Sequence, residues 1–218
     1  MTRAHSGLGM TSQRTRARMI ERLRAEGIRD ERVLAAIAAV PRHVFVEEAL
    51  ASRAYEDSAL PLGFSQTISQ PFIVARMIEI LLAGRALGKT LEIGAGSGYQ
   101  AAVLAQLTPE VYAVERIEPL LARAKLNLRN IQEFRVRLKY ADGHFGLPEA
   151  APFDTIIVAA AAASVPQGLL QQLAPGGRML VPVGTGEQTL SLFERKPEGI
   201  VETRLNSVRF VPLLSGLE

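Results

Sequence analysis

A glycine-rich turn between an apolar strand pattern and a helix pattern is the strongest constraint on the fold of this chain. The stretch L-E-I-G-A-G-S-G-Y runs from Leu91 to Tyr99. Its glycines, Gly94, Gly96 and Gly98, let the backbone approach a ligand at places where a Cβ atom would clash. Glycine-rich turns from a strand into a helix occur in many nucleotide-binding α/β folds, so the turn predicts the class of fold before it predicts a ligand.

Strand and helix patterns alternate on both sides of this turn. Strands are expected at 90–94, 111–115, 136–140, 155–159 and 178–183, and helices at 71–82, 99–107, 118–128 and 167–173. Strands such as T-I-I-V-A are apolar on both faces, as in a parallel sheet that helices cover on each side. Two further strand patterns, 189–193 and 201–211, have no long helix between them. We therefore expect an α/β, three-layer, Rossmann-like fold whose seven-stranded sheet is mostly parallel, with an antiparallel C-terminal strand.

The first 70 residues differ in character from the rest. Residues 1–10 show no periodicity and are expected to form a disordered tail. Residues 11–26 have helical spacing, and a second short helix is expected between Asp30, as its N-cap, and Pro41. We expect a single domain over 11–218, in which a small helical cap (11–70) precedes an α/β cofactor-binding core (71–218).

Composition excludes several kinds of chemistry. The chain has no cysteine, so disulfides, thiolate metal sites and a cysteine nucleophile are excluded. Its three histidines are too scattered to indicate a metal site. A net charge of +3 and 6% aromatic residues do not indicate a nucleic-acid partner. Since no apolar run approaches the ~20 residues of a membrane helix, we expect a cytoplasmic protein without a membrane partner, and we take a monomer as the default.

The spacing of the glycines selects among cofactors. A dinucleotide fingerprint would need glycine where Tyr99 stands, and a phosphate loop would need Gly-Lys-Ser or Gly-Lys-Thr, which is absent. The pattern E-x-G-x-G-x-G, which starts at Glu92, instead resembles motif I of the class I S-adenosylmethionine-dependent methyltransferases. Glu115 ends the next strand about 20 residues after the first glycine, where an acid can bind ribose hydroxyls. Taken alone, an acid such as Glu115 is a surface residue more often than a ligand. Together with the glycine turn and the strand end, it is assigned to the cofactor site.

The third strand of the core ends in A-D-G-H-F, which contains Asp142 and Gly143. Asp-Gly after a strand is first of all a turn. In the methyltransferases that motif I resembles, an acid at this place often accepts a hydrogen bond from the adenine amine, and we assign this role to Asp142. For Glu92 two roles stay open: it either orients the methionine end of the cofactor or holds the glycine turn in shape.

The fourth strand limits the methyl acceptor. Enzymes that methylate amide or base nitrogens often carry N/D-P-P-Y/F after this strand, but here the strand runs F-D-T-I-I-V-A-A-A-A-A-S-V-P. A carboxylate acceptor needs no general base, because its pKa of about 4 leaves it anionic at neutral pH. A carboxylate is therefore favoured over a nitrogen.

The polar run S-Q-T-I-S-Q-P stands directly before an apolar helix pattern. Its simplest interpretation is that Ser69 or Gln70 caps the helix that Pro71 begins. The longer stretch Y-E-D-S-A-L-P-L-G-F-S-Q-T-I-S-Q-P-F-I-V-A-R-M, however, closely resembles a signature of the protein L-isoaspartyl O-methyltransferases. The resemblance extends over nearly the whole chain after about residue 14, since it includes P-R-H-V-F-V, L-A-P-G-G-R-M-L-V-P-V-G and R-F-V-P-L.

The resemblance implies methyl transfer from S-adenosyl-L-methionine, with S-adenosyl-L-homocysteine as product. The acceptor would be the free α-carboxylate of L-isoaspartyl residues in damaged proteins and peptides, and the ester would collapse to a succinimide, which starts repair. By the same resemblance the catalytic residues are Thr67 and Ser69, Gln66 joins the cofactor site, and Phe64, Ser65, Val211 and Pro212 border the peptide site. We expect Thr67 and Ser69 to orient the carboxylate by hydrogen bonds.

Two departures and one open residue accompany the resemblance. Ser65 and Ala141 stand where the family pattern usually has glycine, which leaves the fine geometry of two loops open. Arg42 either anchors the N-terminal cap by an ion pair or meets the substrate. Competing functions are a class I methyltransferase with another acceptor, such as a small molecule or RNA, a non-catalytic module of the same fold, and a dehydrogenase, which Tyr99 disfavours.

Overall fold

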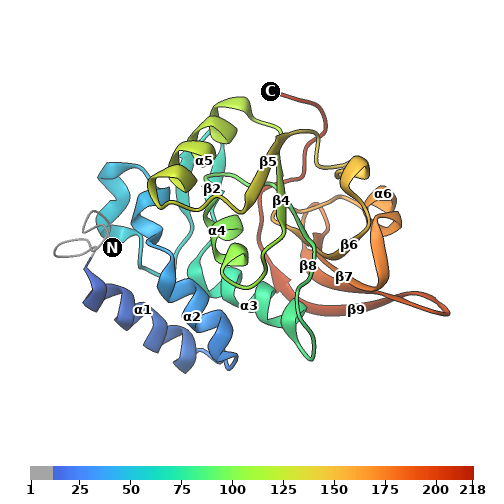
Figure 1. The fold of residues 1–218 in the computed structure, drawn as a ribbon, viewed down its shortest axis with the longest axis horizontal. Helices are drawn as coiled ribbons and strands as arrows, with labels where there is room; N and C mark the ends of the chain where they lie inside the picture. Colours follow the sequence, from blue (N-terminus) through green and yellow to red (C-terminus); the bar gives the residue numbers. More distant parts are fainter. Residues whose placement is uncertain (1–11) are drawn as a thin grey trace.

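A seven-stranded sheet forms the centre of the computed structural model, which describes residues 12–218 (Figure 1). Its strands are β3 (Thr90–Ile93), β4 (Val111–Glu115), β5 (Val136–Tyr140), β6 (Phe153–Val158), β7 (Leu173–Val183), β8 (Gln188–Lys196) and β9 (Gly199–Val208). They are arranged in the order β5-β4-β3-β6-β7-β8-β9. The pairs from β5 to β7 are parallel, and β8 is antiparallel to both β7 and β9. The expected mostly parallel sheet with an antiparallel C-terminal part is confirmed.

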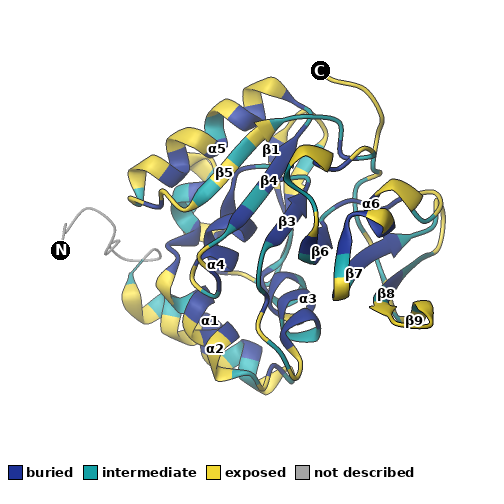
Figure 2. Ribbon diagram, turned by 45° about the vertical axis from the view of Figure 1, so that its right-hand side comes forward, coloured by how far each residue is buried: buried dark blue, intermediate teal, exposed yellow. Residues whose placement is uncertain are grey.

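Helices pack on both faces of the sheet. They are α3 (Pro71–Leu82), α4 (Tyr99–Ala105), α5 (Glu118–Asn130) and α6 (Gln167–Gln171), with a short 3-10 turn η5 (Pro148–Ala150). Successive side chains of β6 lie on opposite faces of the sheet, because side chains alternate along a strand. Ile157 packs into the core that contains α3 and α4, while Ile156 and Val158 pack with α6. The inner strands are consequently buried on both faces (Figure 2).

The N-terminal region contributes helices and an unexpected hairpin. Its elements are α1 (Gln13–Ala25), α2 (Glu31–Ala39), η3 (Arg42–Phe45), η4 (Glu48–Arg53), β1 (Leu60–Gly63) and β2 (Gln66–Ile68). Asp30 is the N-cap of α2 as expected, and its side chain accepts a hydrogen bond from the N–H of Arg32 at 2.9 Å. The β1–β2 hairpin lies in the region expected to form only a helical cap, so these two strands were not predicted. The tail expected at residues 1–10 lies outside the described part of the chain.

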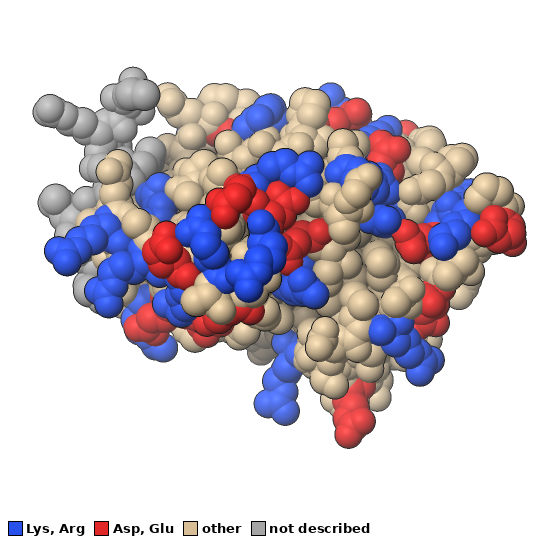
Figure 3. Space-filling view, turned by 90° about the horizontal axis from the view of Figure 1, so that it is seen from below, with Lys and Arg blue, Asp and Glu red and all other residues tan. Residues whose placement is uncertain are grey.

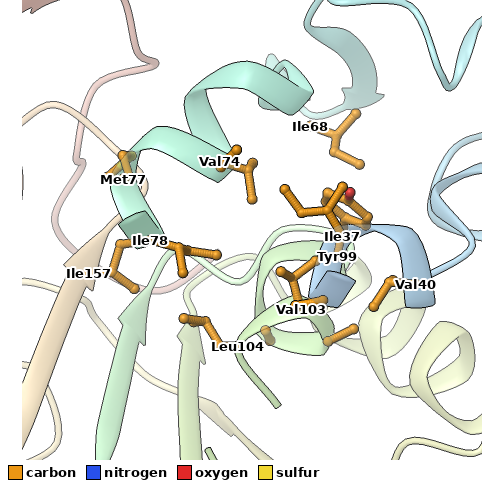
Figure 4. Close-up of a cluster of buried hydrophobic side chains, with 14 of the residues drawn as sticks. Ile37, Val40, Ile68, Val74, Met77, Ile78, Tyr99, Val103, Leu104 and Ile157 are labelled. Carbon is orange, nitrogen blue, oxygen red and sulfur yellow. The ribbon is translucent and has the colours of Figure 1, made fainter. Parts of the chain in front are cut away.

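The N-terminal helices share one hydrophobic core with the sheet. Residues of α1 and α2 such as Leu23 and Leu34 belong to the same buried cluster as residues of α3, α4 and β6. In Figure 4, Ile37 of α2 lies near Tyr99 of α4, with Ile78 of α3 beyond them. The cap is therefore packed onto one face of the core and adds to its burial. Within residues 12–218 no helix has both the length and the apolarity needed to cross a bilayer.

The segment that follows β9 crosses the carboxyl ends of the parallel strands. The N–H of Ala161, just after β6, donates to the carbonyl of Val211 at 2.8 Å, and the N–H of Leu213 donates back to Ala161 at 2.7 Å. Further on, the N–H of Glu218 donates to the carbonyl of Arg116, just after β4, at 2.8 Å. Residues 210–218 thus border the edge of the sheet at which ligands bind in open α/β folds.

Candidate active site

A pocket of about 830 Å³, counting the part open to solvent, lies at the carboxyl ends of β3 and β4. The glycine turn after β3 lines it, as do β2 and the following Ser69. The end of β4 and residues 211–214 complete its wall. The structure therefore brings together three sequence segments that were singled out separately: the glycine turn, the T-I-S run and the late Val-Pro pair.

The glycine turn has a backbone that only glycine adopts without strain. Gly94 has φ 85° and Gly96 has φ 55°, both in the left-handed region, and both residues line the pocket. Gly98 also has a positive φ, 87°, but it lies at the N-cap of α4, where a Cβ would come within 3.3 Å of the Cβ of Ala124. Gly94 and Gly96 thus bring the backbone to the pocket, and their contact with a cofactor stays a prediction. Gly98 does not line the pocket; its missing Cβ instead allows α4 and α5 to pack closely.

Glu92 is fully buried behind the glycine turn and lines the pocket. Its Oε1 accepts a hydrogen bond from Nε2 of Gln100 at 3.0 Å, and its Oε2 has no partner among the described residues. Burial raises the pKa of Glu92 well above its ordinary value of 4.5, and the negative charge of Glu115 adds to the shift. The Oγ atom of Ser97, in the same turn, is likewise buried without a described partner.

Glu115 connects the glycine turn to the turn after β4. Its Oε2 accepts from the N–H of Gly96 at 2.8 Å, and its Oε1 accepts from the N–H groups of Arg116 at 2.8 Å and Ile117 at 2.9 Å. Only 6% of Glu115 is exposed, so the interpretation as a surface acid is wrong. A carboxylate can accept about four hydrogen bonds. Glu115, which lines the pocket, therefore keeps capacity for a ribose hydroxyl, and that role stays a prediction.

Asp142 and Gly143 lie in the turn after β5. Gly143 lines the pocket, and a Cβ on it would come within 2.5 Å of Cγ2 of Ile93. Asp142 lies beside the pocket: Oδ1 accepts from the N–H of His144 at 2.9 Å, and Oδ2 accepts from the N–H of Gly216 at 2.6 Å. Burial opposes the charge on Asp142, but these backbone hydrogen bonds outweigh burial and lower its pKa. Its adenine-binding role stays a prediction.

The β1–β2 hairpin carries the predicted catalytic and peptide-binding residues. Gln66, Thr67 and Ser69 line the pocket, whereas Phe64 and Ser65 form the exposed turn of the hairpin. Both turn residues have positive φ, 51° and 54°, the pattern of a type I′ turn, which is normally made with Asn or Gly. The hydroxyls of Thr67 and Ser69 form no hydrogen bond with any residue of 12–218, which leaves them free to bind a ligand.

The capping interpretation of the polar run is wrong. Pro71 is the first residue of α3, as predicted, but Gln70 at the N-cap makes no side-chain hydrogen bond to the helix. The carboxylate of Asp57 instead accepts a hydrogen bond from the N–H of Phe72, at 2.9 Å. A residue far away in sequence therefore supplies the cap, which leaves no capping task for Ser69.

Arg42 anchors the cap, but not by an ion pair. Its side chain is fully buried, and no carboxylate of the described residues lies within ion-pair distance of it. It donates from Nε to the carbonyl of Ala54 at 2.8 Å and from Nη2 to the carbonyl of Ser69 at 2.6 Å. Arg42 does not line the pocket, so direct contact with a substrate there is not supported.

Sequence reasoning did not single out several residues that line the pocket. Ser97 lies inside the glycine motif, and its place between two glycines could have singled it out. Tyr99 was used only to exclude a dinucleotide. Leu214 follows the predicted pair Val211 and Pro212, both of which line the pocket. Within residues 12–218 no group of acids and histidines could hold a metal ion.

Residues 14–218 match the family model described as protein-L-isoaspartate(D-aspartate) O-methyltransferase. The chain belongs to this family. A protein-L-isoaspartate O-methyltransferase from Dechloromonas aromatica (strain RCB) is 74% identical over 213 residues, which cover 97% of this chain and 99% of that protein. One from Aromatoleum aromaticum is 64% identical over 210 residues, which cover 96% of each protein.

Solved structures of this family have the same fold. One protein-L-isoaspartate O-methyltransferase superimposes with a TM-score of 0.83 at 29% identity, over 93% of this chain and 67% of that chain. A second, from Plasmodium falciparum, was solved in complex with S-adenosyl-L-homocysteine and superimposes with a TM-score of 0.80 at 24% identity, over 90% of this chain and 97% of that one. The predicted class I methyltransferase fold is therefore confirmed.

Proposed function

We infer that the chain transfers a methyl group from S-adenosyl-L-methionine to the free α-carboxylate of L-isoaspartyl residues in damaged proteins and peptides. One observation carries this function: the hydroxyls of Thr67 and Ser69, without partners among the described residues, line the same pocket as the glycine turn. A donor site for a methyl cofactor and a polar site for its acceptor are thereby adjacent. In a chain that belongs to this family, that arrangement supports carboxyl methylation.

The pocket fits the cofactor in the chemistry of its lining. When bound, S-adenosyl-L-methionine supplies a methyl group activated by its sulfonium. The backbone of Gly94 and Gly96 offers close approach, and Glu115 offers a carboxylate for the ribose hydroxyls. The unpartnered polar atoms of Glu92 and Ser97 would bind polar groups at the amino-acid end of the cofactor, because buried polar atoms without partners are costly. Asp142 and Gly143 would border the adenine.

The residues of the hairpin orient the acceptor. Thr67 and Ser69 would each donate a hydrogen bond to the isoaspartyl α-carboxylate and hold one oxygen toward the cofactor. No proton has to be removed, because a carboxylate with a pKa of about 4 is already charged at neutral pH. Catalysis then depends on proximity and orientation, which contribute up to about 7–11 kcal/mol in favourable cases. Ser69 acts as an orienting donor, and its own hydroxyl stays intact.

The peptide would be recognised mainly through its backbone. Val211 and Pro212 line the pocket, and the exposed side chains Phe64 and Leu214, each 47% accessible, offer broad apolar contacts in place of deep side-chain pockets. An enzyme of repair must accept isoaspartate in many sequence contexts, and shallow contacts suit that need. A peptide panel with steep preferences at several flanking positions would contradict this part of the proposal.

Transfer of labelled methyl to a matched pair of peptides tests the function. One peptide contains isoaspartate and the other aspartate at the same place. Base-labile label on the isoaspartyl peptide alone is the expected result, because only this peptide offers a free α-carboxylate in that position. If neither peptide were labelled while S-adenosyl-L-methionine still bound, the acceptor would be a different one, such as a small molecule or RNA.

The binding partners, the oligomeric state and the cellular location of the enzyme are predictions. In Figure 3, Lys and Arg side chains are interspersed with Asp and Glu on the visible face. Ion pairs on the surface, such as those of Arg24 with Glu21 and Glu31, also mix the two charges. Mixed charge of this kind offers no uniformly basic surface there for a nucleic acid. We propose a monomer in the cytoplasm that acts on proteins and peptides. Light scattering would measure the monomeric state directly.

A further inference from the structure

Arg42 is unusual among the buried side chains of residues 12–218. Its side chain is wholly buried. A buried charge normally requires a charged partner, because removal from water costs several kcal/mol. Arg42 donates hydrogen bonds to the carbonyls of Ala54 and Ser69, at 2.8 Å and 2.6 Å, and its Nη1 has no hydrogen-bond partner among the described residues. The negative charge of Asp57 favours the charged guanidinium from beyond ion-pair distance. Arg42 does not line the pocket, so direct contact with a ligand there does not explain its burial.

The guanidinium of Arg42 lies over an aromatic ring. Its central carbon is 4.7 Å from the centroid of the Tyr99 ring, which is within cation–π distance. Tyr99 is the first residue of α4, directly after the glycine turn, and it lines the pocket. Its ring is fixed from another side by Phe45, edge to face, with 5.6 Å between the centroids. Figure 4 shows Tyr99 near Ile37 and Ile68, so the ring is embedded in the shared core.

The guanidinium therefore links the two halves of the active site. Nη2 of Arg42 donates to the carbonyl of Ser69, on the acceptor side, and its central carbon lies over the ring of Tyr99, on the cofactor side. Its Nε also donates to the carbonyl of Ala54, after η4. This third contact fixes the guanidinium relative to both Ser69 and Tyr99. We propose that Arg42 is a positioning residue for methyl transfer: it sets the distance between the Ser69 backbone and the glycine turn. This inference rests on the proposed function.

The geometry requires a guanidinium. A planar guanidinium can donate in its plane to two carbonyls while its face stacks on a ring. A lysine ammonium is a compact and strongly hydrated charge that offers no flat face. Arg42→Lys would therefore keep the charge but lose the simultaneous contacts to Ala54, Ser69 and Tyr99. Because a displacement of 1 Å can reduce a rate by about 100-fold, a small shift of Ser69 is expected to be visible in turnover.

The test compares Arg42→Lys with Arg85→Lys. Arg85 is a matched control, since it donates to the carbonyls of Gly176 and Asp154, both at 2.9 Å, and it does not line the pocket. Turnover on an isoaspartyl peptide is measured per folded molecule, and affinity for S-adenosyl-L-methionine is measured by calorimetry. We expect Arg42→Lys to lower kcat by about 10- to 100-fold with cofactor affinity within about threefold, and Arg85→Lys to keep wild-type kcat.

Tyr99→Leu supplies a second variant, which decides the question if Arg42→Lys does not fold. It removes the ring under the guanidinium and should also lower kcat. In the double variant the losses should be less than additive, because two residues that act as one unit share their effect. The inference would be overturned if either single variant kept the wild-type kcat. It would also be overturned if the losses in the double variant were additive, or if the loss of kcat followed a loss of cofactor affinity. If the wild-type enzyme did not methylate the isoaspartyl peptide, the proposed function itself would fail.

Discussion

The carboxylate of Asp57 accepts a hydrogen bond from the backbone N–H of Phe72, at 2.9 Å, and so caps α3 from outside the T-I-S-Q-P run. Ser69, three residues before Phe72, does not cap the helix, and it lines the pocket. We therefore predict that Asp57 serves the stability of α3 and that Ser69 serves catalysis. The two can be separated by substitution.

Asp57→Ala should lower the free energy of unfolding, by about 1 kcal/mol, because it removes a helix cap. Ser69→Ala should change stability by less than about 0.5 kcal/mol but lower kcat by about 10- to 100-fold, since a hydrogen bond to a charged group contributes about 1.5–3 kcal/mol. Chemical denaturation and turnover per folded molecule measure both effects. A Ser69→Ala enzyme with full turnover would show that this hydroxyl has no catalytic role.

The parallel sheet was predictable because strand patterns alternate with helix patterns and an inner strand such as β6 is apolar on both faces. The expected strands 111–115 and 136–140 coincide with β4 and β5, and the others differ at their ends. The β1–β2 hairpin was not predictable in the same way. Its strands have four and three residues, and its turn residues, Phe64 and Ser65, are not the Asn and Gly that mark a type I′ turn.

Contacts between distant segments were beyond sequence reasoning. The glycine turn and Glu115 could be paired by spacing, because successive parallel strands end at the same edge of the sheet. Nothing in the spacing indicated that Asp57 caps α3, that Arg42 binds the Ser69 carbonyl, or that Gly216 donates to Asp142. Each of these contacts joins segments whose proximity is decided by the packing of the whole chain, and each lies at or beside the pocket.

Ser65→Gly should stabilise the enzyme, because Ser65 has a φ of 54° and a side chain in the left-handed region is strained. The gain should be up to about 1 kcal/mol, after the larger chain entropy of glycine is subtracted. Ser207→Gly, in the exposed strand β9, is the matched control and should destabilise by about 0.5–1 kcal/mol. Thermal or chemical unfolding measures both variants. A destabilising Ser65→Gly would mean that the serine side chain holds the turn.

Glu92→Gln should change how stability depends on pH. Burial raises the folded-state pKa of Glu92 above 4.5, so its favourable contribution to stability is complete below about pH 4.5 and is lost as the pH rises toward the folded-state pKa. Glutamine does not titrate but can still bond Gln100. The variant should therefore gain stability relative to the wild type as the pH rises above about 4.5, by at most about 1.4 kcal/mol per pH unit. Parallel curves of unfolding free energy against pH would contradict the neutral form of Glu92.

Asp142→Asn should weaken the binding of S-adenosyl-L-methionine. The substitution removes the charge that attracts the N–H of Gly216, at 2.6 Å, and would weaken a bond to the adenine amine. Loss of one hydrogen bond to a charged acceptor predicts a Kd about 10-fold higher, measured by calorimetry. Because the pKa of Asp142 is lowered, its contribution to stability is present above the ordinary value of 3.8 and is lost as the pH falls, so the variant should also lose part of the acid sensitivity of the wild type.

Glu149→Gln is the control for Asp142→Asn, because Glu149 is exposed and pairs only with Lys139 among the described residues, at 3.2 Å. It should bind the cofactor as the wild type does. Hydrogen exchange gives a second measurement: the amide of Gly216 should exchange faster in Asp142→Asn, since its acceptor is weakened. Faster exchange with an unchanged Kd would mean that Asp142 holds only the segment after β9. A raised Kd together with faster exchange would support its predicted place at the adenine, beside the segment after β9 that lines the pocket.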